Sequence, residues 1–287
     1  MKIGLLFANT GPFVEPSGLA ALATTAEAIG IESLWAIEHA AVPVGYETPY
    51  PYSRSGRMKG GDDLALPDPL LWLGYAAALT QRLKLATGVL ILPQRHPIYT
   101  AKELATLDVL SEGRLIAGVG IGWLAEEFDA LGIPFAERAA RSEECIRGIR
   151  SLWGPGPSTF EGEHYRWRGL ESNPKPVQPG GVPLVIGGHV AAAARRAAVL
   201  GNGFFPGRGD HQRLRELFDI VARECERIGR DPDEVELSAG GPLRTPDDVR
   251  AFEQLGVSRV ITNIPGSDLD GMRRGLERFK TDVLDKL

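Results

Sequence analysis

The sequence of 287 residues lacks the features that would make it a membrane or secreted protein. It contains no uninterrupted apolar run of about 18 residues, so no membrane span is predicted. The N-terminus lacks a signal peptide, because Lys2 is followed only by the short apolar run 3–8 and by no small-residue cleavage site. We therefore expect a cytoplasmic protein without a membrane partner.

Cysteine is scarce, and metal-binding patterns are missing. Only Cys145 and Cys225 are present, in segments with a helical pattern and without metal-ligand spacing, so we predict two buried thiols. The five histidines show no HExxH or other paired-ligand spacing, and neither a GxSxG nucleophile elbow nor a P-loop occurs. We expect no metal site, and chemistry that comes from a bound cofactor or from histidine and carboxylate side chains.

A concentration of positive charge is also missing. The chain has 32 Lys and Arg against 37 Asp and Glu, for a formal net charge of −5, and its basic residues are scattered. Nucleic-acid-binding proteins usually carry a basic patch or stripe. We therefore expect no nucleic-acid partner and a small molecule as substrate.

What the sequence does contain is a repeated alternation of short apolar runs with longer amphipathic segments. Eight β-then-α units in order predict parallel strands joined by helical crossovers. A single domain over residues 1–287, built as an α/β protein of the (β/α)8 or TIM-barrel type, fits this length, and a doubly wound open sheet is the alternative. The strands are expected at residues 3–8, 33–37, 83–92, 114–120, 183–186, 203–205, 235–239 and 259–263, and the helices at 15–30, 69–80, 98–110, 136–152, 191–200, 212–228, 246–255 and 269–284.

Two stretches interrupt the alternation and are predicted to be insertion loops at the C-terminal face of the barrel. Residues 41–66 follow the second strand and carry Tyr46 among several aromatic and basic side chains. Loops after strands open at the face where barrel active sites lie, so we predict a substrate lid, with a mobile surface loop as the alternative. Residues 153–182, rich in proline and glycine, separate the fourth of these helices from the fifth strand.

One polar pair stands at the end of the predicted second strand. Glu38 and His39 would lie at the barrel mouth, where an imidazole can donate or accept a proton near neutral pH. A lone histidine is more often structural than catalytic, but its position at a strand end makes a structural and a catalytic role equally frequent. Within the third strand, Gly88 precedes Val89 in a β-branched run, where glycine marks a bulge, a close approach by another group or a packing requirement.

Glycines cluster at the ends of two further strands. Gly120, Ile121 and Gly122 lead out of the fourth strand, and Gly187 and Gly188 lead from the fifth strand into a helix. Backbone N–H groups at such turns can approach an anion closely. The spacing is not a Rossmann fingerprint, because no ribose-binding acid follows at the expected offset. The two turns together predict a shared phosphate site, with tight-turn geometry as the alternative for each.

Three segments carry a resemblance to a known family. They are GIESLWAIEH, KLATGVLILPQRHPIYTAKELATLDVLSEGRLIAGVGIGW and PLVIGG. They resemble the bacterial luciferase-like monooxygenase family, and most of all its branch of F420-dependent oxidoreductases. The block over residues 92–114 is the most specific, and the resemblance runs from residue 1 to about residue 205.

The resemblance implies a flavin or deazaflavin ring at the C-terminal mouth of the barrel. It also implies a non-proline cis peptide at Gly88–Val89 that supports the ring, His39 beside the ring, and glycines that receive the cofactor phosphate. Relatives often dimerise through the early helices, so we expect a homodimer; the apolar stretch 70–79 is also compatible with core packing. The expected cofactor-binding residues are Glu38, His39, Gly88, Val89, Gly120, Ile121, Gly122, Gly187, Gly188 and His189.

Two departures from the family pattern bear on the cofactor and the substrate. The sugar-phosphate dehydrogenase branch has a glutamate where this chain has Trp123, which argues against sugar-phosphate oxidation. The luciferase branch has an arginine where this chain has Ile121, which favours F420 over FMN.

The sequence therefore predicts an F420-dependent oxidoreductase that transfers a hydride between the deazaflavin and a small organic substrate held under the 41–66 loop. His39 is the predicted catalytic residue, and His189 either assists the phosphate site or merely begins a helix. The alternatives are an FMN-dependent two-component monooxygenase, a non-catalytic flavin- or F420-binding protein, and a cofactor-free isomerase or lyase. The predicted substrate pocket consists of Tyr46, Trp123, Phe205 and Asn263.

Overall fold

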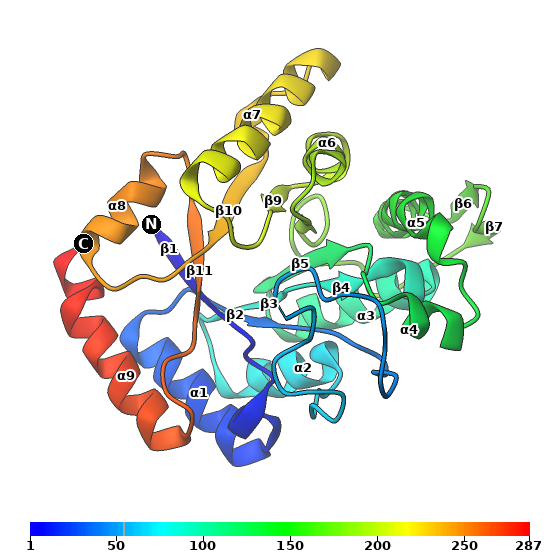
Figure 1. The fold of residues 1–287 in the computed structure, drawn as a ribbon. Helices are drawn as coiled ribbons and strands as arrows, with labels where there is room; N and C mark the ends of the chain where they lie inside the picture. Colours follow the sequence, from blue (N-terminus) through cyan, green and yellow to red (C-terminus); the bar gives the residue numbers. More distant parts are fainter. Residues whose placement is uncertain (54) are drawn as a thin grey trace.

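A computed structural model describes residues 1–53 and 55–287, in which a closed barrel of parallel strands is surrounded by helices (Figure 1). Neighbouring strands pair in the order β3-β2-β1-β11-β10-β9-β8-β5, and a pairing of β3 with β5 closes the ring. This confirms the predicted (β/α)8 barrel against the open sheet. The barrel strands are β1 (Lys2–Leu6), β2 (Ser33–Ala36), β3 (Lys84–Thr87), β5 (Leu115–Gly120), β8 (Leu184–Gly187), β9 (Gly203–Phe205), β10 (Glu236–Gly240) and β11 (Arg259–Asn263).

The predicted strand at residues 83–92 is divided into β3 and a short β4 (Leu90–Ile91). Between them the peptide bond joining Gly88 to Val89 is cis, which confirms the expectation from the family resemblance. β3 pairs with the beginning of β5 and β4 pairs with its end, so both parts follow the same neighbouring strand.

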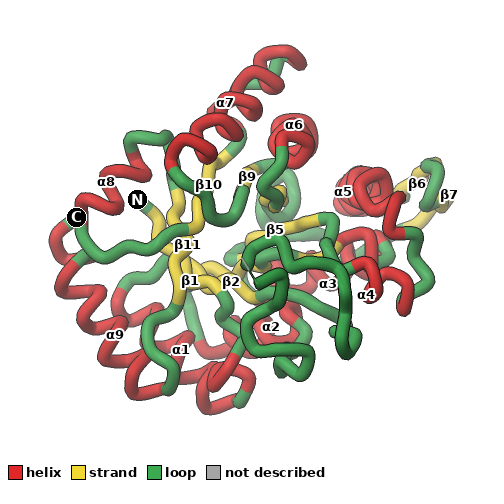
Figure 2. The backbone as a smooth tube through the Cα atoms, viewed as in Figure 1, coloured by secondary structure: helices red, strands yellow, loops and turns green. Residues whose placement is uncertain are grey.

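Helices surround the strands (Figure 2) and lie close to their predicted positions. The exception is α4, which the sequence pattern does not predict because six residues are too few to display a helical period. The helices are α1 (Pro16–Ile29), α2 (Pro69–Leu79), α3 (Pro97–Leu110), α4 (Ala125–Ala130), α5 (Arg138–Trp153), α6 (Ala191–Leu200), α7 (His211–Ile228), α8 (Pro246–Glu253) and α9 (Leu269–Asp282), and the 3-10 turns are η1 (Gly11–Val14), η2 (Leu92–Gln94), η3 (Phe135–Glu137), η4 (Pro232–Glu234) and η5 (Leu284–Lys286).

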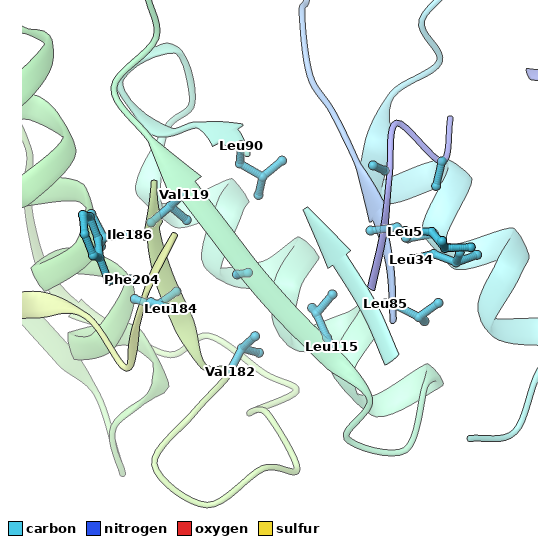
Figure 3. Packing of buried hydrophobic residues seen from close by; sticks show 14 of the residues in the cluster. Leu5, Leu34, Leu85, Leu90, Leu115, Val119, Val182, Leu184, Ile186 and Phe204 are labelled. Carbon is cyan, nitrogen blue, oxygen red and sulfur yellow. The ribbon is translucent and has the colours of Figure 1, made fainter. Parts of the chain in front are cut away.

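Successive side chains of the barrel strands belong to two different cores, as the alternation of a strand requires. One core packs the strands against the helices, and Figure 3 shows its members Leu34, Leu85 and Leu115 along neighbouring strands. The other core fills the barrel and contains Trp35 and Phe205, whose ring centroids are 5.5 Å apart. Its remaining buried members are Ala86, Ile116, Val185 and Ile261.

The second insertion, residues 153–182, lies on the flank of the barrel, which corrects the expectation that it opens at the C-terminal face. It leaves the end of α5 and enters the start of β8, and both of these lie at the opposite end of the barrel. It forms an antiparallel hairpin of β6 (Ser158–Glu161) and β7 (Arg166–Leu170) beside α5 (Figure 1). The buried carboxylate of Glu144 on α5 accepts hydrogen bonds from backbone N–H groups of the hairpin turn, those of Glu163, His164 and Tyr165.

Two smaller expectations can be compared with the structure. Cys145 and Cys225 are both buried and unpaired, as predicted, and burial raises the pKa of Cys145 to about 12. Among the helices of the described residues, none is both long enough and apolar enough to cross a membrane.

Candidate functional site

Val89 lies at the mouth of the barrel against the ends of β5 and β8. A Cβ atom added to Gly120 would lie 2.6 Å from Cγ2 of Val89, and one added to Gly187 would lie 2.7 Å from its Cγ1. Both glycines therefore leave room for the isopropyl group of Val89. This contact accounts for Gly120 and Gly187 without the phosphate role that the resemblance implies.

The glycine that follows next in each of these two turns has a positive φ, which residues with a side chain rarely adopt. Gly122 has a φ of 75° and Gly188 a φ of 136°. A Cβ atom on Gly188 would also lie only 2.8 Å from Cβ of Ala193. Gly188 thus turns the chain directly from β8 into α6. Val190, the N-cap residue of α6, provides no side-chain cap, so the first N–H groups of α6 have no acceptor within the helix.

Polar groups from two other segments lie at this end of α6. The Arg213 guanidinium donates a hydrogen bond to the carbonyl oxygen of His189 at 3.2 Å. Withdrawal from water and the charge of Arg213 both lower the pKa of His189, whose Nδ1 lies 3.4 Å from the Tyr52 hydroxyl. The uncapped helix end and the Arg213 guanidinium can together accept an anion. A second guanidinium, that of Arg208 after β9, donates to Oδ1 of Asn263 at the end of β11 at 2.5 Å.

His39 is held by a carboxylate that the sequence analysis does not identify. Nδ1 of His39 lies 2.9 Å from Oε2 of Glu127, whose side chain is only 1% exposed. Burial by itself would raise the pKa of Glu127, but the hydrogen bond and charge of His39 and the N–H group of Ala41 hold it below the ordinary value. The structure therefore brings together, at the end of β2, an imidazole and an ionised carboxylate.

The 41–66 loop packs on Trp123, in the segment that joins β5 to α4. The ring centroid of Trp123 lies 5.7 Å from that of His39, 5.5 Å from that of Tyr46 and 5.1 Å from that of Tyr50. Glu126 Oε1 accepts hydrogen bonds from the N–H groups of Glu47 and Thr48 at 2.6 and 2.9 Å. The loop is thus anchored to the segment that follows β5, and its role as a substrate lid stays a prediction. Residue 54 of the loop lies outside the described residues.

Tyr46 is a structural part of the loop. Its side chain is buried, its hydroxyl accepts a hydrogen bond from the N–H group of Met58 at 2.9 Å, and the Arg57 guanidinium lies 4.5 Å from its ring centroid. These contacts of Tyr46 stabilise the conformation of the loop, and they hold its ring against the ring of Trp123.

Glu38 is directed into the wall of the barrel and not into its mouth. Its carboxylate accepts hydrogen bonds from the N–H group of Ile91 at 2.5 Å and from Nε of Arg95 at 2.7 Å. Burial raises the pKa of Glu38 despite the guanidinium of Arg95. These contacts account for Glu38 as the residue that fixes β4 and the following turn, and its predicted role in binding the cofactor stays a prediction.

The remaining predicted residues lie at different depths. Phe205 is buried beside Trp35 inside the barrel, Ile121 is half-buried in the turn after β5, and Asn263 is exposed at the end of β11. Within residues 1–53 and 55–287, no three His, Cys, Asp or Glu side chains are grouped so that they could hold a metal ion.

The sequence profile of the luciferase-like monooxygenases matches residues 4–262 of this chain. The chain belongs to the luciferase-like monooxygenase family. Members of this family are flavin- or F420-dependent oxidoreductases, and this chain is one by its membership. The family assignment confirms the expectation from the sequence, and the barrel mouth described above is therefore its candidate active site.

Individual relatives agree with this assignment. The luciferase-like chain is 34% identical over 275 residues to an uncharacterized protein of Mycobacterium tuberculosis, a match that covers 93% of this chain and 94% of that protein. It is 34% identical over 227 residues to the F420-dependent glucose-6-phosphate dehydrogenase of Nakamurella multipartita, covering 77% of this chain and 61% of that enzyme. Its fold is similar to the crystal structure of the monooxygenase RslO1 from Streptomyces bottropensis, with a TM-score of 0.80, 22% identity and coverage of 100% and 99%.

Several residues of this luciferase-like site escape the sequence analysis. Glu126 and Glu127 stand in a short segment where a pair of acids is usually a solvated surface, and Arg208 and Arg213 follow a weak strand. The sequence could have identified these two acids by their position, because they follow Trp123 within a few residues and thus come directly after the end of a barrel strand.

Proposed function

We propose that this luciferase-like protein is an F420-dependent oxidoreductase that transfers a hydride between the deazaflavin and a small organic substrate held under the 41–66 loop. The observation that carries the proposal is the close approach of Val89 to Gly120 and Gly187, because it places a half-buried apolar side chain at the mouth, where the neighbouring strands β5 and β8 end. The similarity to an F420-dependent dehydrogenase over 77% of the chain supports the choice of cofactor.

The residues present fit such a cofactor in two respects. Val89 offers an apolar surface for a planar ring, and the uncapped start of α6, with Arg213 nearby, offers donors for the phosphate and carboxylate groups of the tail. Ile121 provides no charge for a flavin phosphate at the position after β5, which supports F420 over FMN. When bound, the deazaflavin supplies carbon C5 as the donor or acceptor of the hydride.

The protein would contribute binding, orientation and one proton. We assign to Nε2 of His39 the transfer of a proton to or from the substrate. The oxygen atom that gains or loses this proton is bonded to the carbon that gains or loses the hydride. The loop anchored on Trp123 would exclude water from this place, and the barrel end would hold the two reactants in contact.

A binding titration tests the proposal. Purified protein is titrated separately with F420, with FMN and with the phosphate-free deazaflavin chromophore, and fluorescence is recorded. We expect micromolar or tighter binding of F420, weak binding of FMN, and a loss of F420 affinity in Arg213→Gln of about tenfold that the phosphate-free chromophore does not share. Arg227→Gln, on the exposed surface of α7, is the matched control.

Tight binding of FMN with weak binding of F420 would overturn the proposal and favour an FMN-dependent two-component monooxygenase, for which oxygen consumption coupled to a substrate is the confirming measurement. Binding of F420 without turnover of any substrate in a broad screen would instead favour a non-catalytic binding protein. Failure to bind either cofactor would favour a cofactor-free isomerase or lyase.

A further inference from the structure

Glu127 is the most completely engaged carboxylate at the barrel mouth. Its Oε2 meets Nδ1 of His39 at 2.9 Å, and its Oε1 accepts hydrogen bonds from the N–H groups of Ala40 and Ala41 at 2.7 and 3.2 Å. All of these donors belong to the segment in which β2 ends and the 41–66 loop begins. A side chain of α4 therefore fixes both the imidazole and the first residues of the lid.

We propose that Glu127 is the positioning residue of His39, and that it sets which ring nitrogen faces the reacting atoms. This inference rests on the proton-transfer role proposed for His39. An ionised carboxylate can only accept a hydrogen bond, so Nδ1 of His39 carries the proton that points at Glu127. In the neutral imidazole the lone pair then lies on Nε2, and the hydrogen bonds of the described residues reach the His39 ring only at Nδ1.

The adjacent acid in α4, Glu126, contacts a different part of the loop, so the effects of replacing Glu126 and Glu127 can be distinguished. Glu126 accepts hydrogen bonds from the N–H groups of Glu47 and Thr48, further along the loop, and makes no contact with His39 among the hydrogen bonds of the described residues. Consecutive helical residues point about 100° apart, so two neighbouring carboxylates can reach two different parts of the same loop. Glu126 thus anchors the lid, whereas Glu127 anchors its first residues and orients the imidazole.

A purely structural role for Glu127 is the competing explanation, because a buried carboxylate that accepts two backbone N–H groups would hold the loop even without His39. The two explanations differ in the state of the imidazole. If Glu127 positions His39, the tautomer of His39 depends on the charge of Glu127. If Glu127 only holds the loop, replacing its charge disturbs the loop and leaves the tautomer unchanged.

Nitrogen NMR of isotope-labelled, full-length protein without cofactor distinguishes these explanations. The His39 signals are assigned by their absence from His39→Gln, and the spectra are compared for the wild type, Glu127→Gln and the matched control Glu126→Gln. At a pH where the nitrogen shifts themselves show a neutral imidazole, we expect the wild type to show the Nδ1–H tautomer. In Glu127→Gln we expect the nitrogen shifts to move toward the Nε2–H tautomer, since an amide can also donate to Nδ1. In Glu126→Gln the signals of His39 should stay in place.

Amide hydrogen exchange on the same samples provides the second measurement. Glu126→Gln should speed exchange at residues 47 and 48 and leave residues 40 and 41 protected, while Glu127→Gln should do the reverse. An Nε2–H tautomer in the wild type, or an unchanged tautomer in folded Glu127→Gln, overturns the inference. The wild-type result decides the question even if Glu127→Gln does not fold. Because none of these measurements uses a cofactor, their failure is distinct from a failure of the F420 titration.

Discussion

The ring of Trp123 stands edge-on to the ring of Tyr50, with centroids 5.1 Å apart and an interplanar angle of 61°. Trp123 belongs to the segment after β5, and Tyr50 belongs to the 41–66 loop. The pair therefore connects the rigid end of a barrel strand with the loop that covers the mouth. Further edge contacts of Trp123 with Tyr46 and His39 place this indole between the 41–66 loop and the proposed proton carrier.

Loss of the indole should release the 41–66 loop. Each aromatic pair contributes about 0.5–1.5 kcal/mol beyond its buried area, so Trp123→Ala should increase tryptic cleavage after the exposed Lys59 by about tenfold or more. The cleavage rate is measured by mass spectrometry under native conditions. Trp123→Phe, which keeps an aromatic edge, should lie between this variant and the wild type. Equal rates in all three proteins would show that Trp123 does not hold the loop.

The anchor at Glu126 should depend on pH in a defined window. Hydrogen bonds from the side chain and backbone of Thr48 lower the pKa of Glu126 to about 2, against an ordinary 4.5. A lowered pKa in the folded state means that the stabilisation is complete above the ordinary pKa and is lost as the pH falls through the folded value. Amide protection of residues 47 and 48 should thus be constant from neutral pH to about 5 and decline below about 4.5. Glu126→Gln should lack this decline, and a similar decline in that variant would assign it to other groups.

His39 should matter for turnover beyond any effect on stability. General acid–base catalysis contributes about a hundredfold or more, so His39→Ala should lower kcat at least about tenfold on any substrate identified for the protein, while the protein stays folded at the assay temperature as judged by circular dichroism. The same measurements on His96→Asn serve as the control, because His96 is exposed and asparagine can replace it as the N-cap residue of α3. Unchanged turnover in His39→Ala would remove His39 from the mechanism.

Gly120 and Val89 should be energetically coupled. Overpacking of a filled site costs about 1–3 kcal/mol, so Gly120→Ala should lower the free energy of unfolding by that amount. The cost should fall to less than about 1 kcal/mol in the background of Val89→Ala, which removes the methyl group that the new Cβ meets. Urea denaturation of the double-mutant cycle measures the coupling. Gly74→Ala, where the new Cβ has only one neighbour, at 4.0 Å, is the control, and strict additivity of Gly120→Ala and Val89→Ala would contradict the packing argument.

The outer face of α2 should mediate self-association. Leu71 is 79% exposed and Tyr75, one turn later, is 50% exposed, whereas Leu70 and Leu73 are buried. The apolar stretch 70–79 thus has one face that packs in the core and one face that is exposed to solvent. We propose that the exposed face binds a second copy of the chain. Sedimentation velocity should give a dimer for the wild type and for Val199→Asp, and a monomer for Leu71→Asp. A monomeric wild type, or a dimeric Leu71→Asp, would exclude this face.

The sequence by itself determined the barrel, because eight apolar runs alternate with helical segments and each run is short enough to be a strand. It also placed His39 and the paired glycines at strand ends, where the parallel arrangement delivers them to one mouth, and it placed Val89 within the third strand. Positions along a strand and the direction of its end are local properties, so a single sequence is sufficient for them. The division at Gly88–Val89 was expected only from the family resemblance.

Only the tertiary structure decided what these residues touch. The helix α4 is too short to show a period in the sequence. The link of Glu127 to His39, 88 positions apart, therefore emerges only when the closed barrel brings α4, which follows β5, to the end of β2, with β3 between the two strands. The same holds for Gly120 and Gly187, which are explained by the side chain of Val89 in the link between β3 and β4, and for Glu38, which is held in the wall by Arg95. Such contacts depend on how the closed ring brings the strand ends together, and no local stretch of the sequence contains that information.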